Sequence, residues 1–244
     1  MKEVIDMSIT IYGRNPAMEV CLSNKQIFKA FIVEGFKHDV LEKLKEKQVE
    51  IEILPKNVFE RRFSNNAQGI VLEIEDYKTY TLEDIISSLD LTTNPFLLML
   101  DEIEDPHNLG AILRSAEAGG VDAVILPKNR SAKLSGTVAK VSAGAIEYVK
   151  VIEVINLTQT IEKLKKAGFW IVGTSLEATH DYQEIFIDRP LCLIIGSEGF
   201  GIKRLVSEHT DLNVTIPMKG KMNSLNASVS AGILIFDILR RKRG

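Results

Sequence analysis

The apolar run Leu191–Ile195 (LCLII) constrains the fold more than any other stretch of this chain. A strand that is apolar at every position is expected where a parallel sheet is covered by helices on both faces. A second apolar strand is expected at Phe96–Leu100, and helical and extended segments alternate around both. The sequence therefore predicts a doubly wound α/β fold, in which ligands lie beyond the carboxyl ends of the strands.

Two units are predicted along the chain. Residues 1–76 alternate short strands and helices and predict a small α/β module. Residues 77–94 are weakly apolar and partly helical, and they predict a connector. The larger unit spans residues 95–244 and contains both apolar strands.

The composition restricts the class of protein. The 244 residues are 45% hydrophobic and 26% charged, an ordinary balance for a globular chain. No apolar run reaches the ~18 residues of a membrane span, and the first residues do not form a secretory signal. Only Cys21 and Cys192 occur, so we expect a reducing cytoplasm. The net charge of −3 does not favour nucleic-acid binding, so an RNA partner requires local basic patches.

The stretch from Ile216 to Phe236 combines a strand end, a polar loop and the start of a helix. Ser224 or Asn223 is expected to cap this helix, with Asn226 in its first turn. Apolar residues at helical spacing predict that one face is buried; they are Leu225, Val229, Ile233 and Phe236. The start of such a helix can hold a polar ligand, or it can simply be a capped core helix.

The glycine-rich segment Gly196–Gly201 directly follows the buried strand. It matches neither the dinucleotide-binding fingerprint, nor the phosphate-binding loop, nor the nucleophile elbow of hydrolases. A glycine turn at this position lets a ligand approach the backbone closely. The alternative interpretation is a plain turn between a strand and a helix that binds no ligand.

Polar side chains are also expected near the start of a helix at about 109–118. Asn108 lies in the turn before it, and Arg114 lies two turns in. An arginine on the buried side needs an anionic partner, which can be a ligand, Glu117 or Glu198. No metal site is predicted, because the four histidines have no ligand spacing; they are His38, His107, His180 and His209.

Taken together, these segments resemble a known family. The sequences DPHNLGAILR at 105–114, IIGSEGFGI at 194–202 and IPMKGKMNSLNASVS at 216–230 look like the three motifs of the SpoU (TrmH) family of RNA ribose 2′-O-methyltransferases. Residues 130–145 and the sequence IYGRNP at 11–16 are similar to the family as well. The overall likeness is strongest to the type that methylates a guanosine of 23S ribosomal RNA. One departure is Ala67-Gln68-Gly69, where these relatives often have His-Gln-Gly.

The resemblance implies a fold, a cofactor and partners. It implies a SPOUT-type methyltransferase domain with a trefoil knot, preceded by a small domain like ribosomal protein L30e that binds RNA. It also implies S-adenosylmethionine as methyl donor, a homodimer, and neither a membrane nor a metal. By this likeness Gly196, Ile216 and Leu225 bind the cofactor, and Thr174, Leu176 and Met218 line its pocket.

The same likeness assigns the chemistry to Asn108, Arg114, Glu198, Ser224 and Asn226. A neutral ribose hydroxyl is a poor nucleophile, so the charge that develops on its oxygen must be stabilised. A guanidinium, with a pKa above ~12, stabilises charge more readily than it accepts a proton. Two other classes stay open, a non-catalytic RNA-binding module and a different α/β enzyme. Within the family, transfer RNA is the alternative target.

Overall fold

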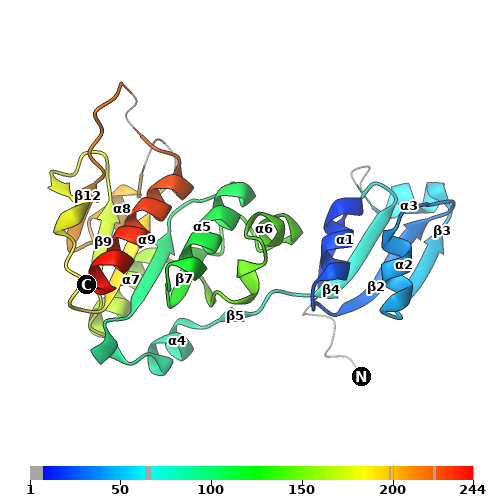
Figure 1. Ribbon diagram of the computed structural model, residues 1–244, viewed down its shortest axis with the longest axis horizontal. Helices are drawn as coiled ribbons and strands as arrows, with labels where there is room; N and C mark the ends of the chain where they lie inside the picture. The colour runs from blue at the N-terminus through cyan, green and yellow to red at the C-terminus, as the bar shows by residue number, and fades with distance from the viewer. Residues whose placement is uncertain (1–7, 64–66, 198, 200, 222–223, 244) are drawn as a thin grey trace. The chain divides into compact units, whose positions relative to one another are not determined.

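A computed structural model describes residues 8–63, 67–197, 199, 201–221 and 224–243. The chain divides into two compact units, which are described separately below (Figure 1). The first contains the residues up to Tyr77 together with 135–140, and the second contains 78–134 and 141–244. No helix in the described part of the chain is both long and apolar enough to cross a membrane.

The first unit is built on a mixed sheet of four strands in the order β1-β4-β2-β3. Strand β4 runs antiparallel to β1 and β2, while β2 and β3 are parallel. Its strands are β1 Ser8–Tyr12, β2 Ile27–Val33, β3 Glu50–Leu54 and β4 Ile70–Glu75, and its helices are α1 Arg14–Leu22, α2 Val40–Glu46 and α3 Lys56–Arg62. Residues of α1 and α2 share one apolar cluster with the sheet, and Phe59 of α3 belongs to another with Phe31 and Val71. Helices therefore cover both faces. Strand β1 was not expected from the sequence.

The second unit is built on an eight-stranded sheet in which the described strand pairs are all parallel. The order is β10-β12-β9-β11-β6-β7-β8-β5. The strands are β5 Thr79–Tyr80, β6 Phe96–Leu100, β7 Ala123–Pro127, β8 Val151–Val154, β9 Trp170–Thr174, β10 His180–Asp181, β11 Leu191–Ile195 and β12 Leu212–Thr215. The prediction of a parallel-sheet α/β fold is confirmed.

The apolar run 191–195 is strand β11, and all five of its residues are buried. It lies between β6 and β9, where Leu191 is in register with both Phe96 and Trp170. The chain order runs outward from β6 through β7 to β8, and it reverses on the other side of β11. Ligands of doubly wound sheets bind where the order reverses. We therefore expect a ligand site at the carboxyl ends of β9 and β11.

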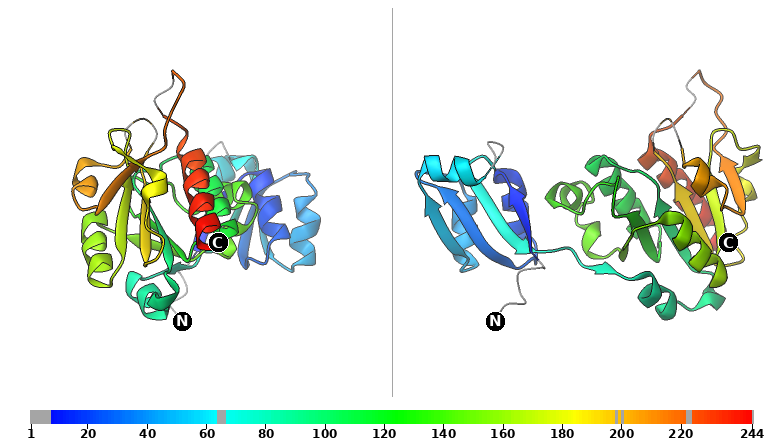
Figure 2. Two further views of the ribbon diagram at one scale, coloured as in Figure 1. Left: turned by 60° about the vertical axis from the view of Figure 1, so that its left-hand side comes forward. Right: turned by 180° about the vertical axis from the view of Figure 1, so that it is seen from behind.

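Helices cover both faces of this sheet. They are α4 Leu82–Ser88, α5 Pro106–Ala118, α7 Leu157–Lys166, α8 Arg204–Ser207 and α9 Ala227–Arg243, with short 3₁₀ turns at Leu91–Thr93, Ala145–Glu147 and Tyr182–Glu184. Helix α6 Gly136–Val141 belongs, up to Lys140, to the first unit. Helices α5 and α9 pack together on one face (Figure 1), and α7 lies on the opposite face (Figure 2). Gly119 permits the contact of α5 with α9, since a Cβ there would lie 2.2 Å from Cγ2 of Ile235.

Of the segment expected to be a connector, 77–94, residues 78–94 belong to the second unit. Strand β5 pairs with β8, and Leu82 and Ile85 of α4 are buried in the core of the sheet. The weak apolar character arises because the helix is short and buries only these two side chains fully. Its Thr81 cap accepts a hydrogen bond from the backbone of Asp84, which fixes where α4 begins.

The sequence prediction for α9 was wrong in two respects. The helix begins at Ala227, three residues later than expected, and Asn226 caps it. Val229, Ile233 and Phe236 are not buried but are 37–48% exposed, whereas the buried side chains are Ala227, Ala231, Leu234, Ile235 and Ile238. Helix α9 is apolar on two sides, and periodicity cannot show which side α5 and the sheet cover.

Candidate cofactor and substrate site

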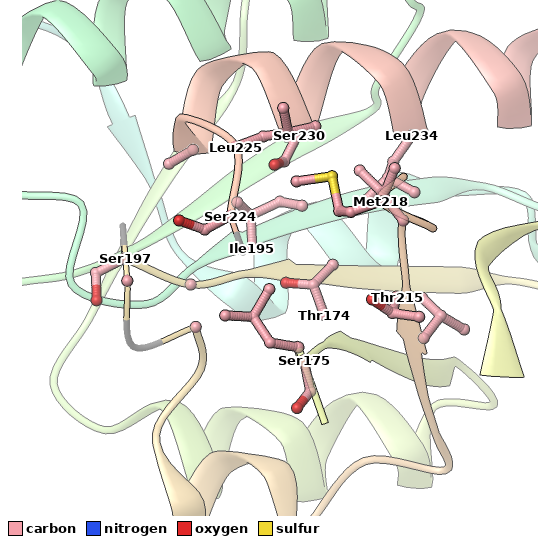
Figure 3. A pocket seen from close by; sticks show the side chains of 17 residues that line it. Thr174, Ser175, Ile195, Ser197, Thr215, Met218, Ser224, Leu225, Ser230 and Leu234 are labelled. Carbon is pink, nitrogen blue, oxygen red and sulfur yellow. The ribbon is translucent and has the colours of Figure 1, made fainter. Parts of the chain in front are cut away.

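A pocket lies beyond the carboxyl ends of β9, β11 and β12. It encloses about 600 Å³, part of it open to solvent. Figure 3 shows Met218, Leu225 and Leu234 on the α9 side, and Thr174 and Ser175 on the side of the strands. Its mostly apolar lining with a few polar groups is typical of sites for small molecules and cofactors.

All six residues expected to bind the cofactor line this pocket. They come from separate parts of the sequence and are Thr174, Leu176, Gly196, Ile216, Met218 and Leu225. Ser224, expected to serve catalysis, lines it too. The sequence did not predict the participation of Ser175, Thr215 or Ser230. Two of these directly follow or end a strand at the ligand edge, which is the signal that would have found them.

The glycine loop after β11 is folded back on itself. The backbone N–H of Ser197 donates to the carbonyl of Gly201 at 3.1 Å, and the N–H of Gly201 donates to Ser197 at 3.0 Å. Gly196 has no room for a side chain, because a Cβ would lie 1.9 Å from the carbonyl carbon of Gly201. The Thr174 hydroxyl donates to the carbonyl of Ile194 at 3.0 Å and ties β9 to β11 beside the loop. This wall of the pocket is therefore largely backbone.

A buried carboxylate that the sequence interpretation overlooked holds the far end of this loop. Asp101, only 3% exposed, follows β6 and accepts a hydrogen bond from the backbone N–H of Lys203 at 2.8 Å. Burial raises the pKa of Asp101, and the hydrogen bond from Lys203 opposes this shift. The neighbouring Glu102 pairs with the Lys203 ammonium at 2.6 Å and with Arg130 at 3.3 Å. The hydrogen bond from Lys203 is the main reason why the pKa of Glu102 is lowered. The sequence feature that could have identified Asp101 is its position directly after a buried strand.

A second, more polar pocket of about 720 Å³ shares Ser197 and Ala227 with the first. Asn108 lines it, and the Asn226 side-chain amide donates to the Asn108 carbonyl oxygen at 2.9 Å. The Asn226 oxygen accepts from the backbone N–H groups of Ser228 and Val229, so the cap of α9 fixes its orientation. Two candidate residues that lie 118 positions apart are thus in direct contact.

Arg114 is placed differently from the other candidates. It is exposed on α5 and does not line either of these pockets. The expected alternative partner Glu117 does not pair with it, and no ion pair joins Arg114 to any other described residue. Glu198, a candidate for the same pairing, lies outside the described residues, as does Asn223. The described part of the chain also contains no group of three or more histidine, cysteine or acidic residues suited to a metal.

Comparison with known proteins identifies the family to which the chain is similar. The model of the SpoU rRNA methylase family matches residues 95–236, and that of the RNA 2′-O ribose methyltransferase substrate-binding domain matches residues 10–80. YacO of Bacillus subtilis strain 168, named as a member of the TrmH family of tRNA/rRNA methyltransferases, is 38% identical over 237 residues and covers 95% of both chains.

Solved structures share the fold. The SpoU methyltransferase AviRb of Streptomyces viridochromogenes, in complex with the cofactor AdoMet, superposes with a TM-score of 0.69 at 20% identity, covering 97% of this chain and 91% of that one. An AdoMet-bound rRNA methyltransferase of Sinorhizobium meliloti gives 0.68 at 22% identity, covering 96% and 88%.

The chain belongs to the SpoU rRNA methylase family. It is accordingly an RNA methyltransferase that uses S-adenosylmethionine, and both of these predictions are confirmed.

Proposed function

We propose that this protein methylates the ribose 2′-oxygen of a guanosine in 23S ribosomal RNA. The observation that carries the proposal is the pocket beyond β9, β11 and β12, because all six residues that the family resemblance assigns to the cofactor line it. The family model, described as an rRNA methylase, supports ribosomal RNA as the target. Action on RNA and two free, buried cysteines support a cytoplasmic location.

The lining of the pocket suits the proposed cofactor. Apolar side chains such as Met218 and Leu225 contact apolar parts of a ligand, while the loop at Gly196 and the hydroxyls of Thr174 and Ser224 provide polar groups. When bound, S-adenosylmethionine supplies a methyl group on a positively charged sulfur. The backbone and aliphatic groups of this wall carry no formal charge, so they leave the positive charge on sulfur unneutralised, which keeps the methyl group electrophilic.

The polar pocket is the proposed site of the ribose. Asn108 and Asn226 hold each other in a fixed orientation there, so they can bind sugar hydroxyls without reorganisation. Arg114 stabilises the negative charge that develops on the 2′-oxygen, because a guanidinium remains protonated at neutral pH.

Two exposed features of the second unit support a homodimer. Val229, Ile233 and Phe236 form an apolar face on α9 and are each 37–48% exposed. Arg114 is exposed as well, although its proposed role requires contact with substrate. Packing of a second copy against α9 would bury the apolar face, which is the usual fate of such a patch.

Two finer points of fold are part of the proposal. The insertion of β11 between β6 and β9 supports the trefoil knot that the family resemblance implies. The four-stranded sheet with helices on both faces supports the L30e-like nature of the first unit, with residues 1–76 as the RNA-binding domain and 95–244 as the methyltransferase domain.

Mapping of 2′-O-methylation in a strain that lacks the gene tests the target. We expect one guanosine of 23S ribosomal RNA to lose its methyl group and to regain it on complementation. Loss from a transfer RNA instead would support the alternative target, and no loss from either RNA would contradict the proposed activity.

A further inference from the structure

A groove on the first unit contains an arginine whose terminal nitrogens are not engaged by any residue that the structure describes. The groove encloses about 1,220 Å³ and is open to solvent. Arg14, Phe36, Lys37, Lys56 and Gln68 contribute to its lining. Among the described residues, Arg14 makes no ion pair, and no hydrogen bond from its two terminal nitrogens is found.

The rest of Arg14 is held firmly. Its backbone N–H donates to Oε1 of Gln68 at 3.1 Å, and its Nε donates to the backbone carbonyl of Gln68 at 3.2 Å. The guanidinium carbon lies 5.4 Å from the centre of the Phe36 ring. Since the Nε bond fixes the plane of the group, the two terminal nitrogens present four N–H donors in a defined direction.

The turn at 68–69 is shaped to support this pair. Gln68 and Gly69 have φ angles of +51° and +82°, which places both in the left-handed region. A Cβ on Gly69 would lie 2.8 Å from Cγ1 of Val33 and 3.0 Å from Cδ2 of Phe36. Glycine therefore lets the Phe36 ring lie close to the turn that binds Arg14.

The lining of the groove indicates the kind of ligand. Lys37 and Lys56 are accompanied by Glu34 and Glu60, so the groove carries both signs of charge. Carboxylates repel phosphate but accept hydrogen bonds from the amino and imino groups of a base. Unpaired RNA bases stack on aromatic rings and on arginine planes, and their edges accept bidentate hydrogen bonds from arginine.

We infer that this groove binds one unpaired nucleobase of the RNA substrate, stacked beside Phe36 and hydrogen-bonded by Arg14. The inference rests on the proposed function and specifies how the first unit recognises RNA. The departure at Ala67 does not remove this site, because Ala67 is fully buried in the apolar cluster of Phe31 and Phe59, while Gln68 and Gly69 line the groove.

Affinity for RNA tests the inference in the full-length protein. The probe is deproteinised 23S ribosomal RNA from a strain lacking the gene, and the dissociation constant is measured by filter binding at fixed salt. We expect Arg14→Ala and Phe36→Leu each to raise the constant about tenfold, as is typical for the loss of one stacked base. Arg61→Ala is the matched control, because Arg61 is exposed on α3 of the same unit and does not line the groove.

Three further measurements make the result decisive. Arg14→Lys should lose nearly as much affinity as Arg14→Ala, since lysine keeps the charge but not the planar fork. Calorimetry with S-adenosylmethionine should give unchanged affinity in all variants, and thermal unfolding should show that they are folded. Loss of RNA affinity with no methylation by the wild type would reject the proposed activity but support the groove.

Other outcomes overturn the inference. Full recovery by Arg14→Lys would mean that the groove attracts phosphate and not a base. Equal losses in Arg14→Ala and Arg61→Ala would mean that RNA is held by diffuse charge. Wild-type affinity in folded Arg14→Ala protein, or no RNA binding by the wild type, would show that this groove does not recognise RNA.

Discussion

The two proposed ligand sites of this protein are built from different parts of the polypeptide. The pocket of the second unit lies at the ends of parallel strands, and one of its walls is the backbone of the loop at Gly196 and Gly201. The groove of the first unit is formed by side chains, with Arg14 and Phe36 placed by a left-handed turn. A backbone wall tolerates changes in surrounding side chains but not added volume, whereas a side-chain site depends on individual residues.

The largest effect on the rate of methyl transfer is expected from Arg114, which is proposed to stabilise the negative charge that develops on the ribose 2′-oxygen. Arg114→Ala should lower the single-turnover rate of methyl transfer about 10²–10³-fold, which is typical for the loss of one preorganised donor to an oxyanion. Arg114→Lys should restore little of it. Cofactor affinity and thermal unfolding should be unchanged, because Arg114 is exposed and unpaired among the described residues.

Arg204→Ala is a suitable control, because this exposed arginine of the same unit pairs only with Glu208 in the described structure. It should methylate at the wild-type rate. Wild-type activity per folded molecule of Arg114→Ala would reject the catalytic role.

The backbone wall predicts the next largest effect. Gly196→Ala should displace the glycine loop, because the added Cβ would overlap the backbone of Gly201. Displacement of a binding loop by about 1 Å can cost about 10²-fold in rate, and cofactor affinity should fall with it. Gly120→Ala is the control: its φ of +67° adds a backbone strain that Gly196 does not have, yet nothing lies within 4 Å of its Cβ position, so it should leave the glycine loop in place. Equal cofactor affinity in both variants would show that the wall is not needed.

The hydrogen bond from Lys203 to Asp101 should have a smaller effect. Asp101→Asn replaces a charged acceptor by a neutral one, and the weaker bond should raise the dissociation constant for S-adenosylmethionine about fivefold, equivalent to about 1 kcal/mol. Calorimetry measures this change. An unchanged dissociation constant would show that Asp101 does not hold the glycine loop in its binding position.

The same substitution predicts a pH dependence of stability. The pKa of Asp101 is raised in the folded protein. Its contribution to the free energy of unfolding is therefore fully present below the unfolded pKa of about 3.9, and it is lost as the pH rises through the folded pKa. Since Asn does not titrate, Asp101→Asn should become more stable relative to the wild type as the pH rises through this window. Denaturant unfolding at several pH values measures the difference, and a constant difference would contradict the assignment.

The smallest effect is expected when the two sites are separated. A fragment of residues 78–244 should bind S-adenosylmethionine within about twofold of the full chain, because the residues that line the pocket all belong to this part. A 2-fold change is about 0.4 kcal/mol. The same fragment should bind RNA more weakly.

A fragment that begins at residue 95 lacks β5 and the buried Leu82 and Ile85, so we expect it to unfold more readily than the 78–244 fragment. Wild-type RNA affinity in the folded 78–244 fragment would contradict the role of the first unit.

The sequence was most informative where local pattern and burial coincide. The five apolar residues of β11 predicted a parallel strand covered on both faces, and the structure places it at the centre of such a sheet. Motif resemblance brought together Gly196, Met218 and Leu225, which are remote in sequence and share one pocket.

Where tertiary packing decides, the sequence was not sufficient. The apolar residues Val229, Ile233 and Phe236 predicted a buried face, but α5 and the sheet cover the other apolar side of α9. Asp101 was overlooked because its role depends on a hydrogen bond from a residue 102 positions away, which the local sequence does not show. The open position of Arg114 could not be predicted either, since it depends on how α5 is rotated against the sheet.

The most direct test of the central claim is transfer of labelled methyl groups from S-adenosylmethionine to RNA. Wild-type protein is incubated with deproteinised 23S ribosomal RNA or transfer RNA from a strain lacking the gene, and the labelled nucleoside is identified by mass spectrometry after digestion. The account predicts 2′-O-methylguanosine from 23S ribosomal RNA and its near absence with Arg114→Ala. A methyl group on a base, or no transfer to either RNA by folded protein that binds the cofactor, would contradict it.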